Sequence, residues 1–85
     1  MSENRIPNYE QSQKLFGAKK GDRVHIFRRA QNHESGWQNT WDPEMDRAVG
    51  KDGEVISRNH SSGGILIKVD GISDYFYPYF VLRLK

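Results

Sequence analysis

The chain contains no cysteine. It therefore has no disulfide framework, no thiolate zinc site and no cysteine nucleophile, which removes the usual supports of small secreted domains. It also lacks a run of the roughly 18 apolar residues that a membrane helix requires, and its first residues show no basic segment followed by an apolar one. These absences predict a cytoplasmic protein with no membrane partner.

An excess of charge of one sign is also missing. The 13 lysine and arginine residues are offset by 11 acidic residues, which leaves a net charge of +2 over 85 residues. Both signs are interleaved along the chain, so long-range attraction to polyanions is expected to be weak. A chain of this length is expected to form one domain with one core.

Recognisable catalytic motifs are absent from the sequence. There is no nucleophile elbow, phosphate-binding glycine loop or zinc motif, and the three histidines lie far apart. Asp42, Glu44 and Asp46 alternate, but the other ligands of a calcium loop are missing. Asp42 and Pro43 instead fit the cap and first position of a short helix. We therefore predict that the protein is not an enzyme and holds no metal and no cofactor.

Turn residues divide the chain into short segments. Residues 1–18 are polar with scattered apolar side chains and predict a flexible or partly helical N-terminal arm, with a short helix over Tyr9–Phe16. In residues 19–85, glycine, proline and aspartate separate short stretches that are predicted to be strands. The first of these stretches alternates clearly between apolar and polar residues. The predicted strands are Arg23–Arg29, Glu54–Arg58, Ile65–Val69, Tyr75–Tyr77 and Leu82–Leu84.

A long polar connection follows the first predicted strand. It runs from Ala30 to Asp46, and loops of this length inside a compact domain are usually functional. A helical turn over Met45–Val49 and two hairpins follow it, and a tight turn at Tyr79–Val81 leads into the last strand. About five short strands in this order predict a mainly β fold, a small SH3-like barrel with a long first loop and a short helical turn.

Several motifs carry a resemblance to known families. Gly21–Val24, the stretch WDPEMDRAVGKDG (Trp41–Gly53) and the ending YPYFVL (Tyr77–Leu82) occur together in this chain. From Lys20 to Lys85 it resembles the SH3-like domains of the mind-bomb type and small SH3-like proteins encoded by bacteriophages. The resemblance implies a non-catalytic module that binds a protein segment, such as a phage accessory or host-modulating protein.

A second family is similar over part of the same residues. Gly21–Val24 and Gly50–Val55 look like the KOW motif of ribosomal and transcription-factor barrels, which implies an approach to RNA or to a polymerase. The chain departs from that motif because the Trp37–Asp46 loop separates two halves that KOW motifs hold in one hairpin. The basic residues that would carry nucleic-acid binding are Arg28, Arg29, Lys51 and Arg58.

The long connection carries both tryptophans. Trp37 and Trp41 lie four residues apart, so their side chains share one side of either a helical or an extended segment. They form either a flat shelf for a peptide or a base, or a plug for the open end of the barrel. Trp41, which is close to Met45 and Val49, is the expected plug, and Trp37 is the expected exposed contact.

The last hairpin is rich in aromatic residues. If Phe76 faces inward, strand alternation turns Tyr75 and Tyr77 outward and leaves Tyr79 at the mouth of the barrel, just after Pro78. This arrangement resembles the aromatic groove in which SH3 folds bind extended peptides. Alternatively, these tyrosines only cover the sheet while their hydroxyls remain in water.

Three functions are therefore predicted, in this order. The first is a non-catalytic module that recognises a protein partner through an aromatic cleft. The second is a nucleic-acid-binding barrel, and the third is a structural or oligomeric component of a larger assembly. The isolated chain is expected to be a monomer or a weak homo-oligomer. The predicted partner contacts are Trp37, Trp41, Tyr75, Tyr77 and Tyr79.

Overall fold

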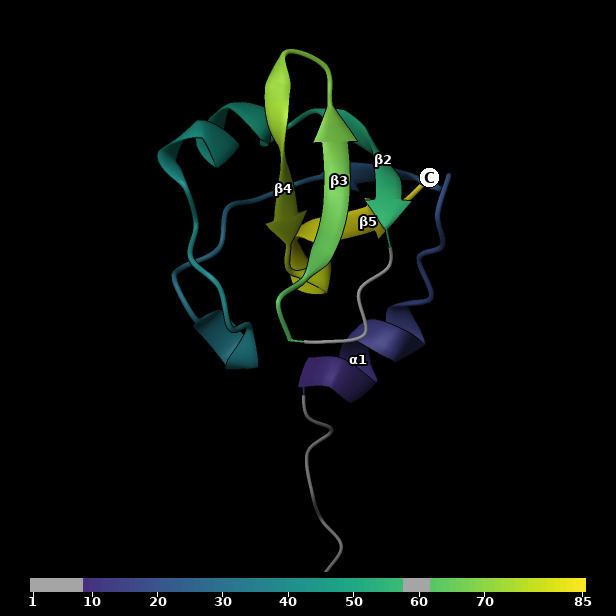
Figure 1. Cartoon of the computed structure of the whole chain (residues 1–85), viewed down its shortest axis with the longest axis vertical. Helices are drawn as coiled ribbons and strands as arrows, with labels where there is room; N and C mark the ends of the chain where they lie inside the picture. The colour runs from purple at the N-terminus through teal and green to yellow at the C-terminus, as the bar shows by residue number, and fades with distance from the viewer. Residues whose placement is uncertain (1–8, 58–61) are drawn as a thin grey trace, which may run out of the picture.

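The computed structural model describes residues 9–57 and 62–85, which form one small, mainly β domain (Figure 1). The predicted mainly β class, the five strands and the helix over Tyr9–Phe16 are confirmed. In chain order the elements are α1 (Tyr9–Phe16), β1 (Arg23–Ile26), the short 3-10 helices η1 (Glu34–Gly36) and η2 (Pro43–Ala48), β2 (Asp52–Ser57), β3 (Ile65–Val69), β4 (Ile72–Tyr77), the 3-10 helix η3 (Tyr79–Val81) and β5 (Leu82–Leu84).

The five strands form one antiparallel sheet in the order β4-β3-β2-β1-β5. The register shifts between Val55 and Ser57 of β2 and between Ile67 and Val69 of β3, and such bulges bend and twist a sheet. Within the described ranges β4 and β5 are the edges, so the ladder of hydrogen bonds does not close on itself.

Three predicted strands have different bounds in the structure. The first ends at Ile26 instead of Arg29, because the Ile26 carbonyl accepts from the Gly50 N–H at 2.7 Å and the chain then leaves the β2 ladder. The last hairpin is longer than predicted, since β4 begins at Ile72. The second strand begins at Asp52 instead of Glu54, and its predicted end at Arg58 lies outside the described residues.

The predicted cap of the short helix after the long connection is confirmed. Asp42 Oδ1 accepts a hydrogen bond from the Glu44 N–H at 2.9 Å, and Pro43 is the first residue of η2. The Asp42 N–H in turn donates to the sulfur of Met45 at 3.2 Å. These contacts are internal to the start of η2, and the helix itself packs on β4, as Figure 1 shows in teal beside the first part of that strand.

The core lies between the inner face of the sheet and the long connection from β1 to β2. Apolar residues of four strands are fully buried there, and the connection adds both tryptophans and Met45. At one end of the molecule α1 packs on η3 (Figure 1). The sheet contributes Val24, Ile26, Val55, Ile65, Ile67, Val69 and Tyr77 to this core.

Candidate functional site

Three of the five predicted partner contacts form a buried aromatic stack, here defined as Trp37, Trp41 and Tyr77. The ring centroids of Trp37 and Trp41 are 6.5 Å apart, and those of Trp41 and Tyr77 are 5.9 Å apart, both edge to face. Trp37 is 0% exposed and Trp41 is 6% exposed. The prediction of an exposed Trp37 is therefore wrong, whereas the predicted burial of Trp41 is confirmed.

Hydrogen bonds explain why both indoles can be buried. Trp37 Nε1 donates to the Gly63 carbonyl at 2.9 Å, and Trp41 Nε1 donates to Asp46 Oδ1 at 2.7 Å. A buried N–H that finds an acceptor avoids the cost of desolvation without a partner. Gly64 is required beside the stack, because a Cβ there would lie 3.0 Å from Trp37 Nε1 and 2.8 Å from the Tyr77 carbonyl oxygen.

The predicted orientation of the last hairpin is also wrong. Tyr77 is fully buried instead of facing outward, while Phe76 is only half-buried. The register decides this, because Tyr77 lies opposite Ile65 and Tyr75 opposite Ile67, and both isoleucines face the core. Burial raises the pKa of the Tyr77 hydroxyl to about 12. That hydroxyl has no hydrogen-bond partner among the described residues.

Tyr75 is half-buried and its hydroxyl is engaged by acidic groups of the long connection. It donates to Glu44 Oε1 at 2.6 Å and also lies 3.3 Å from Asp42 Oδ1. The hydrogen bond to Glu44 is the main cause that raises the pKa of Tyr75. Tyr75 therefore ties η2 to β4, and a partner could use its hydroxyl only by replacing Glu44.

Tyr79, the fifth predicted contact, belongs to a different group of rings. Its ring centroid lies 6.2 Å from that of Phe16 in α1 and 5.5 Å from that of Phe80 in η3. All three side chains are half-buried. We call Phe16, Tyr79 and Phe80 the aromatic strip, and it is the surface in the described part of the chain where aromatic rings from distant segments meet solvent together.

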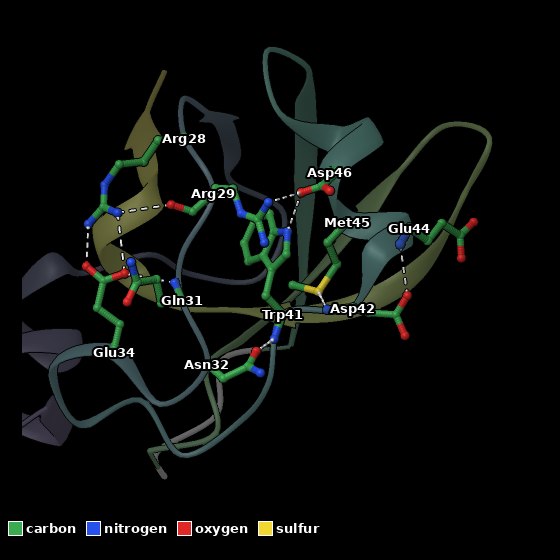
Figure 2. Close-up of polar contacts among 10 residues, drawn as sticks. All are labelled: Arg28, Arg29, Gln31, Asn32, Glu34, Trp41, Asp42, Glu44, Met45 and Asp46. Carbon is green, nitrogen blue, oxygen red and sulfur yellow. Dashed lines mark hydrogen bonds and ion pairs between the residues drawn. The ribbon is translucent and has the colours of Figure 1, made fainter.

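The aromatic strip continues into a charged hollow of about 550 Å³ lined by Arg28, Arg29, Gln31 and Glu34. Arg28 connects the two, since its guanidinium carbon lies 5.1 Å from the centre of the Phe80 ring. Its nitrogens also contact both oxygens of Glu34, at 3.1 and 3.5 Å (Figure 2). The Gln31 N–H and Arg28 lower the pKa of Glu34, so the pair is charged at neutral pH.

The predicted nucleic-acid contacts are brought together only in part. Arg28 and Arg29 follow β1, and the Lys51 backbone carbonyl accepts from the Ile26 N–H close by. Arg29 lies 3.7 Å from Asp46 Oδ1, so each arginine has an acidic neighbour (Figure 2). Arg58 lies outside the described residues. A phosphate would therefore have to compete with carboxylates for both arginines.

Another cluster of ionisable groups lies on the outer face of the sheet. Asp52 contacts His25 Nδ1 at 2.7 Å and Lys85 Nζ at 2.8 Å, which lowers the pKa of its carboxyl group. No hydroxyl nucleophile hydrogen-bonds to His25, and no metal-binding group of three ligands occurs within residues 9–57 and 62–85. These contacts fit a solvated face with cross-strand pairs of opposite charge.

Four residues of the candidate surface were not identified from the sequence, namely Phe16, Phe80, Gln31 and Glu34. Phe16 and Tyr9 lie on one face of α1, seven residues apart, and this spacing is the signal that could have shown an apolar face. Glu34 gave no such signal, because its pairing with Arg28 depends on how the long connection folds back.

The comparisons with known proteins add no relative. No family model, no curated protein and no solved structure matches the chain. No helix in the described ranges is long and apolar enough to cross a membrane. A functional proposal must therefore be argued from the surface of this chain alone.

Proposed function

We propose that the chain is a non-catalytic module that binds a segment of a protein partner along the aromatic strip and the charged hollow. The observation that carries the proposal is the meeting of half-buried rings with Arg28 and Glu34 on one surface. Aromatic and arginine side chains dominate the binding energy of protein interfaces, because they offer large areas and little flexibility. A partner would remove these rings from water.

We further propose that the fold is SH3-like. The support is topological: a long connection follows β1, two hairpins join β2, β3 and β4, and η3 comes directly before β5. The strand β5 then returns to pair with β1. In SH3 folds an aromatic groove of this kind accepts an extended peptide. The aromatic strip, which includes two residues of η3, is the corresponding surface here.

The charges of the hollow indicate what the partner segment carries. Arg29 is the more exposed arginine, and its contact with Asp46 at 3.7 Å is longer than that of Arg28 with Glu34 at 3.1 Å. An acidic side chain of the partner can therefore approach Arg29 without breaking the closer pair. The expected ligand is a segment with an apolar or aromatic residue over the aromatic strip and a carboxylate at the hollow.

The test is a selection of displayed peptides against the full chain, followed by titration of the selected peptide into isotope-labelled protein. We expect amide shifts at Tyr79, Phe80 and Arg28, and weaker binding to Arg28→Ala. The matched control is Arg83→Ala, because Arg83 lies over the Phe27 ring at the same distance of 5.1 Å but away from the strip. Equal loss in both variants, or shifts confined to other surfaces, would contradict the proposal.

The nucleic-acid alternative is tested with the same labelled protein. Single-stranded and double-stranded oligonucleotides are added at two salt concentrations, because phosphate contacts weaken steeply as salt rises. Salt-sensitive shifts at Arg28, Arg29 and Lys51 would replace the protein-binding proposal by a nucleic-acid one. We expect no such shifts, since the two signs of charge are interleaved along the chain and leave a net charge of only +2.

A further inference from the structure

Tyr9, the first residue of α1, occupies a slot beside the aromatic strip. Its ring lies 5.2 Å from that of Tyr79 and 6.4 Å from that of Phe80, and its hydroxyl accepts a hydrogen bond from the Tyr79 N–H at 3.2 Å. Gly36 of η1 lies against the base of this side chain, since a Cβ there would come within 3.2 Å of Tyr9 Cβ. The slot thus recognises both the flat ring and the oxygen of a phenol.

Elsewhere in α1 Gln13 is also buried, with 5% of it exposed, and the other side chains are exposed or half-buried. Glu10 accepts a hydrogen bond from the Ser62 hydroxyl at 3.2 Å, and Phe16 packs on Tyr79 with its ring half-buried. Leu15 is 81% exposed on the outer side. A helix of eight residues is unstable alone in water, so α1 depends on such contacts to remain folded. Tyr9, which is only 5% exposed, adds ring contacts and a hydrogen bond to η3.

We infer that the slot between Gly36 and η3 is a binding site for a tyrosine side chain, which α1 fills from within the chain and a tyrosine-bearing segment of a partner fills in its place. This inference rests on the proposed function for the partner, although the slot itself is defined by the contacts of Tyr9. Displacement of α1 would also uncover more of the Tyr79 and Phe80 rings. The partner's tyrosine would then be the anchor, and its neighbours would lie on Tyr79 and Phe80, the residues of the aromatic strip that do not belong to α1.

The slot can be tested without a partner by p-cresol, which is the side chain of tyrosine as a free molecule. Tyr9→Ala in the full chain empties the slot. We expect p-cresol to raise the melting temperature of this variant in a saturable way and to shift the amide proton of Tyr79. Toluene, which lacks the hydroxyl, should not shift that amide proton downfield. Tyr75→Ala is the control, because it removes a tyrosine elsewhere and should gain nothing from p-cresol.

A folded Tyr9→Ala variant that p-cresol neither stabilises nor shifts would overturn the inference. Hydrogen exchange of the unmodified chain gives an independent answer if this variant does not fold. Since α1 is expected to open alone, its amides should be protected at least about tenfold less than those of β2 and β3. Equal protection would mean that α1 leaves only on global unfolding, and would also overturn the inference.

The two proposals can fail separately. If p-cresol fills the slot and no displayed peptide binds the full chain or the Tyr9→Ala variant, the tyrosine site stands and the binding function fails. If a selected peptide binds at Arg28 and Phe80 with the same affinity in both proteins, the function stands and displacement of Tyr9 is wrong. A tyrosine peptide that binds Tyr9→Ala more tightly than the full chain supports both.

Discussion

The molecule contains two groups of aromatic side chains that differ in their relation to water. In the buried stack of Trp37, Trp41 and Tyr77 the rings are enclosed, and both indole N–H groups have protein acceptors. In the aromatic strip the rings are half-buried and border the charged hollow. Aromatic content alone therefore does not identify a binding surface, because this chain uses rings of the same kind in both places.

The two groups also differ in what they connect. The buried stack joins the long connection to the inner face of the sheet, so its loss should affect the whole domain. The aromatic strip joins α1 to η3 at one end of the molecule. We therefore expect substitutions in the stack to reduce stability most, and substitutions in the strip to reduce binding most.

The largest effect is expected for Trp37→Ala. Replacement of a fully buried tryptophan by alanine costs about 3–5 kcal/mol, and small domains have only about 5–15 kcal/mol in total. The Gly63 carbonyl would also lose its donor. We expect a chain that is partly unfolded at 37 °C, seen as collapsed amide dispersion and a lower urea midpoint. An unchanged midpoint would mean that Trp37 does not belong to the core.

The position of the two groups could be predicted from the sequence only in part. Local sequence signals predicted the bounds of four elements correctly, namely α1, β3, η3 and β5. Turn residues such as Gly71 and Pro78 mark where these elements begin or end. The cap at Asp42 was also predicted correctly. Each of these features depends on residues that are close together in the chain.

The errors concern contacts between distant residues. Trp37 is buried because Gly63, 26 positions later, supplies its acceptor, and Tyr77 faces the core because of its register with Ile65. Of the aromatic strip only Tyr79 was predicted, because its contact with Phe16 of α1 joins distant parts of the chain. Alternation within one strand could not decide such contacts, and the SH3-like resemblance stays a prediction.

A smaller effect on stability is expected for Phe80→Ala. Full burial of such a side chain contributes about 1.5–3 kcal/mol, and Phe80 is only half-buried, so we expect a loss of roughly 1 kcal/mol by urea unfolding. Binding of a selected peptide should fall much further, because Phe80 supports both Arg28 and Tyr79. The result would separate the surface role of the strip from the structural role of the stack.

Phe27→Ala is the matched control for that experiment. Phe27 is 40% exposed and also carries an arginine, Arg83 of β5, over its ring, but its ring is not among those that contact Phe16, Tyr79 or Phe80. We expect a similar small loss of stability and no loss of peptide binding. If both variants lose binding equally, the aromatic strip has no special role and the comparison between the two groups fails.

The smallest change is expected for Tyr77→Phe, which alters one oxygen in the buried stack. The Tyr77 hydroxyl is buried without a partner among the described residues, and an unpaired buried hydroxyl costs free energy. Phenylalanine keeps the ring and its contact with Trp41. We therefore expect the free energy of unfolding at about pH 7 to stay the same or rise by about 1 kcal/mol.

We also expect Tyr77→Phe to change how the stability of the chain depends on pH. Burial raises the pKa of Tyr77 from 10.0 to about 12, so the folded chain holds this proton over a range in which the unfolded chain releases it. The raised pKa therefore contributes fully to the free energy of unfolding below about pH 10. This contribution is lost as the pH rises from there to about 12, by about 1.4 kcal/mol per pH unit. Unfolding in urea at about pH 7 and about pH 11 should show a smaller loss for Tyr77→Phe than for the unmodified chain. Tyr9 also has a raised pKa, but its effect is the same in both proteins and cancels in the difference. Equal losses would show that the Tyr77 hydroxyl reaches water, and the stack would then be less enclosed than its contacts indicate.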